Sequence, residues 1–253
     1  MSSDSKIKET VKKHYGEIAR GGSSCCGSGK TSCCGPSDTA VSLVHGYNPN
    51  DLATLPAGAD LGLGCGNPLS IVEIQPGWKV LDLGSGAGID VFMAAKRVGE
   101  SGHVTGLDMT DEMLAKAWEN ARRGGYTNVS FIKGEIEAMP FADNSFDLVI
   151  SNCVINLVPD KRQAYREIRR VLKNGGQLAI ADMAVRGEMP APIRKSAEEW
   201  AGCVAGALNL EEYLAIVREI GFTEVGTTFV NEYDYGRDEK FALLSIGLTG
   251  RKQ

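Results

Sequence analysis

The pattern of apolar and polar residues becomes regular at Trp78 and stays so up to residue 184. Short apolar runs such as "KVLDLG" are typical of buried strands, and they alternate with amphipathic stretches such as "DEMLAKAWENARRGG". Strands that alternate with helices in this way predict an α/β fold with a mainly parallel, doubly wound sheet. The expected strands are residues 79–84, 103–109, 129–134, the start of 145–157 and 177–184, and the expected helices are residues 90–99, 111–125 and 160–172.

The two ends of the chain do not follow this alternation of strands and helices. Residues 5–20 carry apolar side chains at helical spacing, which predicts a short amphipathic helix, and a Gly-, Ser- and Cys-rich loop follows it. Asn174-Gly175-Gly176 is expected to close the helix at 160–172 as a left-handed cap. Three regions are expected: an N-terminal helix with its Cys-rich loop at 1–48, the alternating domain at 49–184 and a small C-terminal α+β segment at 185–253. In the last region we expect helices over 193–208 and 209–222 and a final strand over 241–248.

Composition and charge narrow the class of protein. A hydrophobic content of 43% and a charged content of 23% are typical of a globular protein, and no run approaches the ~20 apolar residues of a membrane span. The net charge of -5 provides no electrostatic basis for binding nucleic acid or an anionic membrane. Because no secretory signal opens the chain, we expect a cytoplasmic protein whose seven cysteines stay mostly reduced. A monomer is the default expectation.

A glycine-rich turn follows the first expected strand. "VLDLGSGAG" places Gly84, Gly86 and Gly88 at the junction with the next helix, where glycine lets the backbone approach a ligand closely. The third glycine comes one residue earlier than in the dinucleotide-binding fingerprint, and Asp82 precedes the first glycine by two positions. The next strand ends at Asp108, whose two carboxylate oxygens suit a ribose diol.

Two acidic residues, Glu135 and Glu137, follow the third expected strand, and either one suits an adenine amino group. Together these features resemble class I S-adenosylmethionine-dependent methyltransferases over residues 71–183. The resemblance implies a seven-stranded Rossmann-like sheet, with Asp108 on the ribose and Glu135 at the adenine. Some cofactor contacts are implied by the resemblance and others are suggested by their position in the sequence. Together they are Asp82, Gly84, Gly86, Gly88, Asp108, Met109, Glu135, Ile136, Glu137 and Asn152.

Three further cysteines stand far apart in the sequence. Cys153 follows the carboxyl end of a strand, where doubly wound sheets bind ligands, while Cys65 lies between glycines and Cys203 among small residues. Taken singly, each thiol could be a small buried hydrophobic side chain. Zinc sites generally use paired C-x₂₋₄-C ligands, and none of these three cysteines has a partner at that spacing. Three thiolates without a fourth ligand suit a soft, three-coordinate centre.

The surroundings of these cysteines resemble the arsenite methyltransferase family. The resemblance is carried by "DLGLGCGNP", "LDLGSGAGIDVF", "GLDMTDEML", "SNCVINLVPDK" and "AGCVAGAL", from about Asp51 to Phe222. It implies methyl transfer from S-adenosylmethionine to trivalent arsenic held by the thiolates of Cys65, Cys153 and Cys203, which leaves S-adenosylhomocysteine. The substrate would be arsenite or its thiol adducts, and a thiol reductant such as glutathione or thioredoxin would be a partner. Two other functions stay open: methylation of a small quinone- or sterol-like molecule, and non-catalytic arsenic binding.

The stretch "SSCCGSGKTSCCG" holds the other four cysteines, Cys25, Cys26, Cys33 and Cys34. It is not a phosphate-binding loop, because Ser24 stands where G-x-x-x-x-G-K-[ST] needs its first glycine and no strand precedes it. A zinc site and a segment without function both stay open. We favour a thiol collector that captures arsenite and passes it to the three separated thiols, with Cys33 or Cys34 as the relay.

Overall fold

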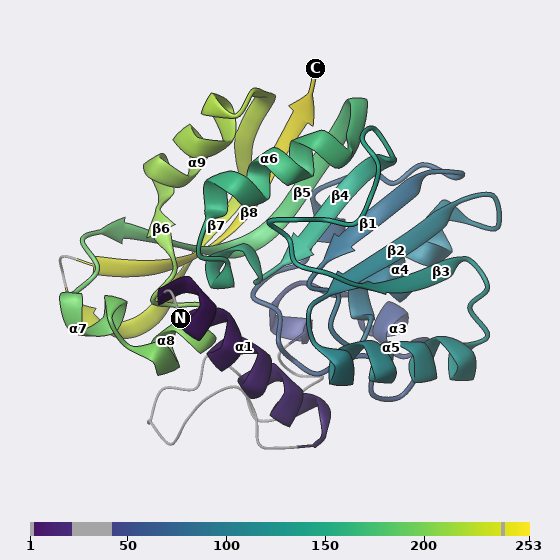
Figure 1. Ribbon diagram of the computed structural model, residues 1–253, viewed down its shortest axis with the longest axis horizontal. Coiled ribbons are helices and arrows are strands. Elements are labelled where there is room, and N and C mark those ends of the chain that lie inside the picture. Colours follow the sequence, from purple (N-terminus) through teal and green to yellow (C-terminus); the bar gives the residue numbers. More distant parts are fainter. Residues whose placement is uncertain (1–2, 22–41, 239–240) are drawn as a thin grey trace.

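The centre of the protein is one mixed β-sheet, seen in a computed structural model that describes residues 3–21, 42–238 and 241–253 (Figure 1). Within these residues, seven strands follow the order β3-β2-β1-β4-β5-β8-β7, and the short β6 pairs with β5 outside this path. The strands from β3 to β5 are parallel, whereas β8 is antiparallel to both β5 and β7. The strands are β1 (Lys79–Leu83), β2 (His103–Asp108), β3 (Val129–Lys133), β4 (Phe146–Asn152), β5 (Leu172–Gly187), β6 (Leu208–Asn209), β7 (Phe222–Asp238) and β8 (Phe241–Lys252).

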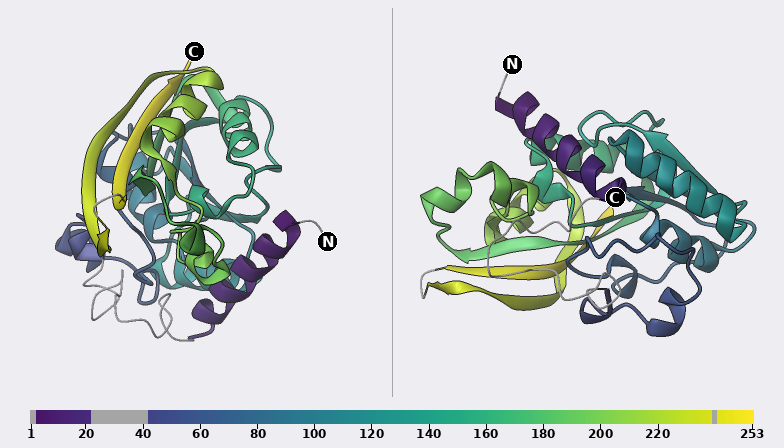
Figure 2. Two further views of the ribbon diagram at one scale, coloured as in Figure 1. Left: turned by 90° about the vertical axis from the view of Figure 1, so that its left-hand side faces the viewer. Right: turned by 90° about the horizontal axis from the view of Figure 1, so that it is seen from below.

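Helices cover both faces of the sheet, which confirms the predicted doubly wound fold (Figure 2). α4 and α5 pack on one face, and α6 and α9 pack on the other. α1 lies outside these layers, against α5 and α8. The helices are α1 (Ser3–Ala19), α3 (Pro49–Leu52), α4 (Ile89–Val98), α5 (Asp111–Gly124), α6 (Lys161–Val171), α7 (Ala191–Arg194), α8 (Ala197–Ala201) and α9 (Leu210–Glu219), with 3₁₀ turns η1 (Pro68–Ser70) and η2 (Ile155–Leu157).

Alternate residues of the central strands fill two separate cores. In β1, Val80 packs beneath α4 and α5, whereas Leu81 packs beneath α6 and α9. In β4, Ile150 belongs to the first core and Val149 to the second. Successive side chains of a strand point to opposite faces. A sheet buried on both faces therefore has nearly continuous apolar strands, which is why these strands were recognisable from the sequence.

Most of the expected elements are confirmed, but the expected cap of the helix at 160–172 is wrong. α6 ends at Val171, and Leu172 already has an extended backbone. Leu172 pairs with Phe146 at the start of β5 and is fully buried, so the sheet ends this helix. Gly175 does have a left-handed φ of +78°, but it lies within β5.

The C-terminal part departs further from expectation. In place of a helix over 193–208 there are two short helices, α7 and α8, and Cys203 lies in a turn after them. The sequence also missed β7, an edge strand whose register against β8 shifts three times. β5 runs on to Gly187 and pairs with β8, so residue 184 lies inside a strand. The division into three regions stays a prediction.

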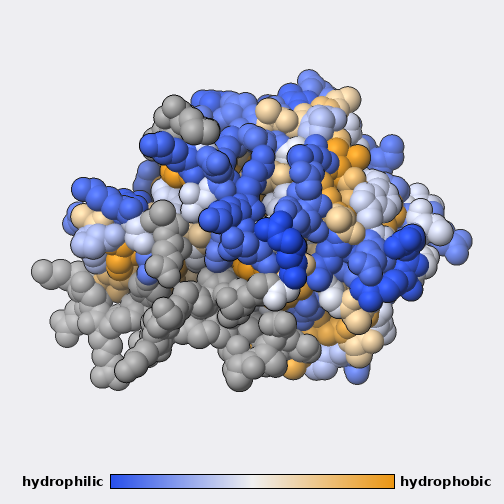
Figure 3. Space-filling view, turned by 60° about the horizontal axis from the view of Figure 1, so that its bottom comes forward, coloured by the Kyte–Doolittle hydropathy of each residue, from blue (hydrophilic) through white to orange (hydrophobic). Residues whose placement is uncertain are grey.

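Few large apolar side chains are exposed among the described residues. None of the described helices is both long and apolar enough to cross a membrane. The face in Figure 3 is mostly hydrophilic, with small patches of hydrophobic residues. Scattered apolar side chains of this kind are normal for a globular protein. Large apolar side chains that are exposed within the described residues are Leu43, Val44, Trp118, Ile132 and Val230.

Gly88 allows α4 to start close against the sheet. Its φ is +101°, and an added Cβ would lie 2.6 Å from the Phe92 ring and 3.3 Å from that of Phe131. We expect Gly88→Ala to lower the free energy of unfolding by about 3 kcal/mol, because backbone strain adds to overpacking.

Gly125→Ala is the matched control at the end of α5. Gly125 also has a left-handed backbone, with a φ of +68°, but an added Cβ would meet nothing within 4 Å. Only the backbone strain of about 1–2 kcal/mol is expected there. Urea unfolding measures both losses, and equal values would contradict a packing role for Gly88.

Candidate active site

A pocket opens at the carboxyl ends of the parallel strands. Its wall comes from the loops after β1, β2, β3 and β4, from the segment between Ser42 and Gly64, and from α1. It encloses about 1150 Å³, counting the part open to solvent, which is room for a nucleoside-sized ligand. Among the described residues, Gly88 is not part of the wall, because it caps α4 and packs against Phe92. The predicted site residues that do line the pocket are Asp82, Gly84, Gly86, Asp108, Met109, Glu135, Ile136, Glu137, Asn152 and Cys153.

Three buried carboxyl groups, those of Asp82, Asp90 and Asp108, line the pocket. Burial raises the pKa of Asp82 well above its usual range, and the neighbouring Asp90 and Asp108 raise it further. Burial also raises the pKa of Asp90 to about 6, against hydrogen bonds from Tyr47 and Asn152 that lower it. A positively charged ligand would stabilise the ionised carboxylates, so this cluster favours a cation.

Asp108 ties the glycine turn to the end of β2. Its Oδ2 accepts a hydrogen bond from Gly86 N at 3.0 Å. An added Cβ on Gly86 would contact only the Met113 sulfur, so the turn leaves open space where a ligand can approach the backbone. An added Cβ on Gly84, in contrast, would lie 2.5 Å from a methyl group of Val154. Gly84 therefore makes room for the loop that follows β4.

α1 closes one side of the pocket. Lys8 Nζ lies 2.7 Å from Oε2 of Glu135 and 2.7 Å from Oε2 of Glu137, the two acids expected at an adenine. The hydrogen bond from Lys8 lowers the pKa of Glu135. Lys8, Val11 and Tyr15 line the pocket from one face of the helix. Sequence analysis missed Lys8, although its spacing from Val11 was an available signal.

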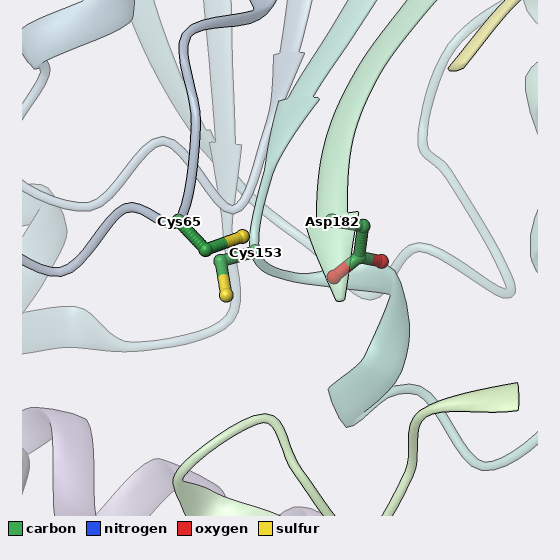
Figure 4. Close-up of side chains that lie close together, drawn as sticks. All are labelled: Cys65, Cys153 and Asp182. Atoms are coloured by element: carbon green, nitrogen blue, oxygen red, sulfur yellow. The ribbon is translucent and has the colours of Figure 1, made fainter. Parts of the chain in front are cut away.

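The three separated cysteines belong to one buried cluster beyond β4, and Figure 4 shows two of them, Cys65 and Cys153. The Sγ atoms of Cys65 and Cys153 and a carboxylate oxygen of Asp182 all lie within 4.8 Å of one another. Cys65 comes from the loop before β1, Cys153 from the chain leaving β4 and Asp182 from β5. Cys203 is not in that group of described residues, but its Sγ donates a hydrogen bond to Cys153 O at 2.9 Å. Asp182 was not expected from the sequence.

The backbone is strained at two of these cysteines. Cys153 has a φ of +58° and Cys203 a φ of +64°. They are two of the four non-glycine residues with positive φ in the part of the chain that the structure describes. A left-handed backbone costs roughly 1–2 kcal/mol for such residues. Strain of this kind tends to be kept at functional sites, where the surrounding structure determines the conformation.

The side chain of Asn152 holds the Cys65 loop against β4. Its Oδ1 accepts a hydrogen bond from Cys65 N at 3.1 Å, and its Nδ2 donates to Gly66 O at 2.9 Å. The same Nδ2 also donates to Tyr47 Oη at 2.8 Å and to Asp90 Oδ2 at 3.3 Å. Asn152 therefore connects the thiol cluster with the acidic pocket. Nothing in the sequence marked Tyr47 or Asp90 as pocket residues.

The glycines beside Cys65 permit this close approach. An added Cβ on Gly64 would lie 2.7 Å from Asn152 Nδ2, and one on Gly66 would lie 2.8 Å from Ala181 Cβ. On the other side of the loop, Ser245 Oγ of β8 donates to Cys65 O at 2.6 Å. The loop is thus fixed at both its N–H and its carbonyl group.

The surroundings of Cys153 and Cys203 disfavour the thiolate form, because they raise the pKa of both thiols. A hydrogen bond to Cys203 lowers the pKa of Cys153, but the neighbouring Cys65 and burial outweigh it, so that pKa is raised well above the usual range. The hydrogen bond to Cys153, together with burial, raises the pKa of Cys203 well above its usual range. A soft centre that binds these thiols must therefore displace their protons.

Comparison with known proteins identifies the family. A family model described as a methyltransferase domain matches residues 74–224. The X-ray structure of CrArsM, an arsenic(III) S-adenosylmethionine methyltransferase from Chlamydomonas reinhardtii, is similar with a TM-score of 0.69 and 37% identity, over 84% of this chain and 73% of that one. An arsenite methyltransferase of Halobacterium salinarum is 42% identical over 261 residues, covering 98% of this chain and 67% of that relative. This chain belongs to the arsenite methyltransferase family.

The relatives in the arsenite methyltransferase family are longer than this chain. The human arsenite methyltransferase is 36% identical over 230 residues, which cover 87% of this chain but 59% of that relative. The predicted fold and the predicted enzyme class, an S-adenosylmethionine-dependent methyltransferase, are both confirmed by these matches. The pocket fits the cofactor of this class in its charge, because its buried acids face a ligand that carries a positive sulfonium group.

Cofactor binding by this arsenite methyltransferase family member should depend on pH. Below pH 6 the raised pKa of Asp90 leaves most of that carboxyl group protonated, and the raised pKa of Asp82 acts in the same direction. We expect the affinity for S-adenosylmethionine to fall roughly tenfold from pH 8 to pH 5, the effect of losing one charge about 10 Å away at an effective dielectric constant of about 20.

S-adenosylhomocysteine, which lacks the sulfonium charge, is the control ligand for this measurement. Calorimetric titration at each pH gives both affinities. The affinity for S-adenosylmethionine, divided by that for S-adenosylhomocysteine, should fall on acidification. A constant ratio would show that the buried acids do not act on the charge of the ligand.

Proposed function

We propose that the protein transfers the methyl group of S-adenosylmethionine to trivalent arsenic held by the thiolates of Cys65, Cys153 and Cys203. Methyl transfer to arsenic follows from membership of the arsenite methyltransferase family, whereas the three-thiolate site is argued from geometry. The main support for the three-thiolate site is that Cys153 belongs to both the pocket and the thiol cluster. This residue lines the acidic pocket, and its Sγ lies in the thiol cluster with Cys65. A ligand bound by the cluster would therefore lie beside the cofactor.

The two alternative functions have less support. A methyltransferase for a quinone or a sterol has no use for strained, buried thiols at the wall of its pocket. A non-catalytic arsenic-binding protein leaves the acidic pocket and its glycine turn unexplained. The arrangement of one pocket beside one thiol cluster favours an enzyme that brings two reactants together.

The residues around the pocket have separate tasks in holding the cofactor. When bound, S-adenosylmethionine supplies a methyl group on a positively charged sulfur, which makes the methyl carbon electrophilic. Asp108 would accept hydrogen bonds from the ribose hydroxyls, and Gly86 would leave room at the methionine part. Glu135 and Glu137 would lie at the adenine, with Lys8 balancing their charge from α1.

The arsenic chemistry needs positioning more than acid–base catalysis. Trivalent arsenic bound to three sulfurs keeps a lone pair opposite them, and this lone pair is the nucleophile. Because it carries no proton, no general base is required for the attack. Holding two reactants in line can supply about 7–11 kcal/mol of a barrier. The apolar cluster around the thiols, which includes Val11 and Leu157, excludes water. This favours a transfer in which the positive charge passes from the cofactor sulfur to arsenic and is spread over both atoms in the transition state.

The protons of the buried thiols have a route out of the site. When arsenite binds, each thiol proton can leave with one arsenite hydroxyl group as water while an arsenic–sulfur bond forms. Three thiols and one arsenite thus give one tris-thiolate complex and three waters, with no change in oxidation state. The raised pKa values of Cys153 and Cys203 therefore do not prevent binding.

Further parts of the proposal concern partners and the other regions of the chain. Turnover would use glutathione or thioredoxin as reductant in the cytoplasm, and the enzyme would act as a monomer. Cys25, Cys26, Cys33 and Cys34 lie outside the described residues, so the relay through Cys33 or Cys34 stays a prediction. In this scheme region 1–48 captures arsenite, region 49–184 binds the cofactor and region 185–253 contributes the third thiol.

Cys153→Ser and Cys203→Ser should each remove methyl transfer to arsenic. We expect turnover to fall at least about 100-fold, because the substrate would no longer be held in line with the methyl group. The assay is the appearance of labelled methyl groups on arsenic from S-adenosylmethionine, arsenite and glutathione. Binding of S-adenosylhomocysteine should be retained and serves as the folding control.

The same assay separates the alternative functions. Variants that keep normal activity would contradict the three-thiolate site. Tight arsenite binding by the unmodified protein, with all label left on S-adenosylmethionine, would contradict the enzymatic proposal and favour a binding protein.

Asn152→Ala should weaken arsenite binding more than cofactor binding. Losing the hydrogen bonds to Cys65 N and Gly66 O removes about 1–3 kcal/mol, which corresponds to roughly 5- to 150-fold in arsenite affinity. Asn128→Ala is the matched control, because its Nδ2 donates to Ala95 O at 2.9 Å and to Gly99 O at 3.0 Å, outside the pocket. That variant should keep the arsenite affinity. A larger loss for S-adenosylhomocysteine than for arsenite would instead make Asn152 mainly a cofactor contact.

A further inference from the structure

Asp182 is a buried carboxylate that neither the cofactor pocket nor the arsenic site uses. It follows Ala181 in β5, whose carbonyl oxygen accepts a hydrogen bond from Cys153 N at 2.8 Å. Asp182 is fully buried, and one of its oxygens lies within 4.8 Å of the Sγ atoms of both Cys65 and Cys153. In Figure 4 the three side chains come from three different segments of the chain and gather at one place.

In the part of the chain that the structure describes, no positive side chain neutralises this carboxylate directly. Within the described residues, Asp182 forms no ion pair. The neighbouring Lys161 acts on it only through space, because its ammonium group donates to Asn156 O at 3.2 Å and to Val158 O at 3.0 Å. An anionic group buried without a charged partner is costly. A cation bound at Asp182 would remove that cost.

Hydrogen bonds fix the orientation of the Asp182 carboxylate, as they do for carboxylates that bind metal ions. Its Oδ1 accepts a hydrogen bond from Met183 N at 2.9 Å, and its Oδ2 accepts two, from Asn156 N at 3.2 Å and from Tyr213 Oη at 2.9 Å. A carboxylate offers about four acceptor positions, so one position on Oδ1 is left. Hydrogen bonds from outer residues commonly fix metal-binding carboxylates in this manner.

Arsenic and a divalent cation require different donors. Trivalent arsenic takes three sulfurs and keeps a lone pair in the fourth direction, so a carboxylate adds nothing to its coordination. Zn²⁺ and Cd²⁺ have no such lone pair and accept four ligands from thiolates and carboxylates. With sulfur at about 2.3 Å and oxygen at about 2.0–2.2 Å, the ligand atoms of a tetrahedral zinc site lie about 3.6–3.8 Å apart. Separations of up to 4.8 Å can contract to this range by small side-chain rotations.

We propose that Cys65, Cys153 and Asp182 form a binding site for a thiophilic divalent cation such as Zn²⁺ or Cd²⁺. Cys203, whose Sγ lies beside Cys153 O, is the fourth ligand. On binding, each coordinating thiol releases its proton to solvent and no electron is transferred. The site shares its sulfurs with the proposed arsenic site but adds one ligand that arsenic does not use. Zinc and cadmium therefore compete with arsenite, and Asp182 distinguishes the two kinds of ligand.

Cadmium binding tests this site without cofactor or arsenite, so the result does not depend on methyl transfer. The other thiols of the full chain are removed by the substitutions Cys25→Ser, Cys26→Ser, Cys33→Ser and Cys34→Ser. Titration with Cd²⁺ is followed by the sulfur-to-cadmium charge-transfer absorption, and cadmium NMR identifies the ligands. We expect one bound ion with a chemical shift typical of three sulfurs and one oxygen. A shift typical of sulfur ligands alone would overturn the proposal.

Asp182→Asn in the same background separates cadmium from arsenic. Loss of the carboxylate should weaken cadmium binding by about 100-fold while arsenite affinity changes less than about threefold. Cys203→Ser is the matched variant and should weaken arsenite binding more than cadmium binding. Cadmium affinity that is unchanged in Asp182→Asn would overturn the proposal.

Tyr213→Phe covers the case in which Asp182→Asn fails to fold, as judged by loss of S-adenosylhomocysteine binding. This variant keeps the carboxylate but removes one hydrogen bond that orients it. Cadmium affinity should fall about tenfold and arsenite affinity should stay the same. Equal cadmium affinities for the Tyr213→Phe variant and its parent would overturn the proposal.

Discussion

The parallel pairing of β1 with β2 and β4 is the constraint on which the rest of the structure depends. Parallel strands end at the same edge of a sheet, and the loops leave a crevice where the strand order reverses, here between β1 and β4. The register pairs Leu83 with Leu107 and with Ser151, so the glycine turn and the ends of β2 and β4 lie level with one another. β5 extends beyond that edge and pairs Ala181 with Asn152, which places Asp182 beside Cys153. Strand order and register thus bring the pocket, Cys153 and Asp182 to one edge of the sheet.

The thiol cluster is assembled differently, from segments that the sheet does not contain. The Cys65 loop is held between the Asn152 side chain and Ser245 Oγ. The Cys203 turn packs so closely that an added Cβ on Gly206 would overlap the carbonyl oxygen of Asn156. Tyr15 of α1 reaches the same turn, with its Oη 3.3 Å from Ala201 O and 3.8 Å from Cys203 Sγ. Polar contacts and small residues therefore determine where the sulfurs lie, and the left-handed backbone at Cys153 and Cys203 is maintained by these surroundings.

The buried acidic residues make the protein more stable when a cationic ligand is bound than when the pocket is empty. Asp82, Asp90 and Asp108 are all nearly inaccessible to water, and burial raises the pKa of each of them. Their ionised forms are therefore unfavourable in the empty pocket, and a cationic ligand relieves that cost. Asp182 presents the same situation beside the thiols, where burial raises its pKa to about 6. A chain with a net charge of -5 that keeps carboxylates inside is suited to ligands that bring positive charge.

The sequence by itself determined the parallel half of the sheet, and it predicted most of the strand-end residues that line the pocket. β1, β2, β4 and β5 are apolar on both faces, and the glycine turn and Asp108 follow strand ends within a few residues, so local patterns were sufficient. The three cysteines were also found, through the family resemblance around them. Only the tertiary structure decided that Lys8 pairs with Glu135, that Asn152 holds the Cys65 loop and that Asp182 joins the thiols. It alone also placed β7 at the sheet edge, where shifting register hides any regular pattern. These contacts join residues far apart in the chain, and they depend on strand order and register, which the periodicity of a local segment does not encode.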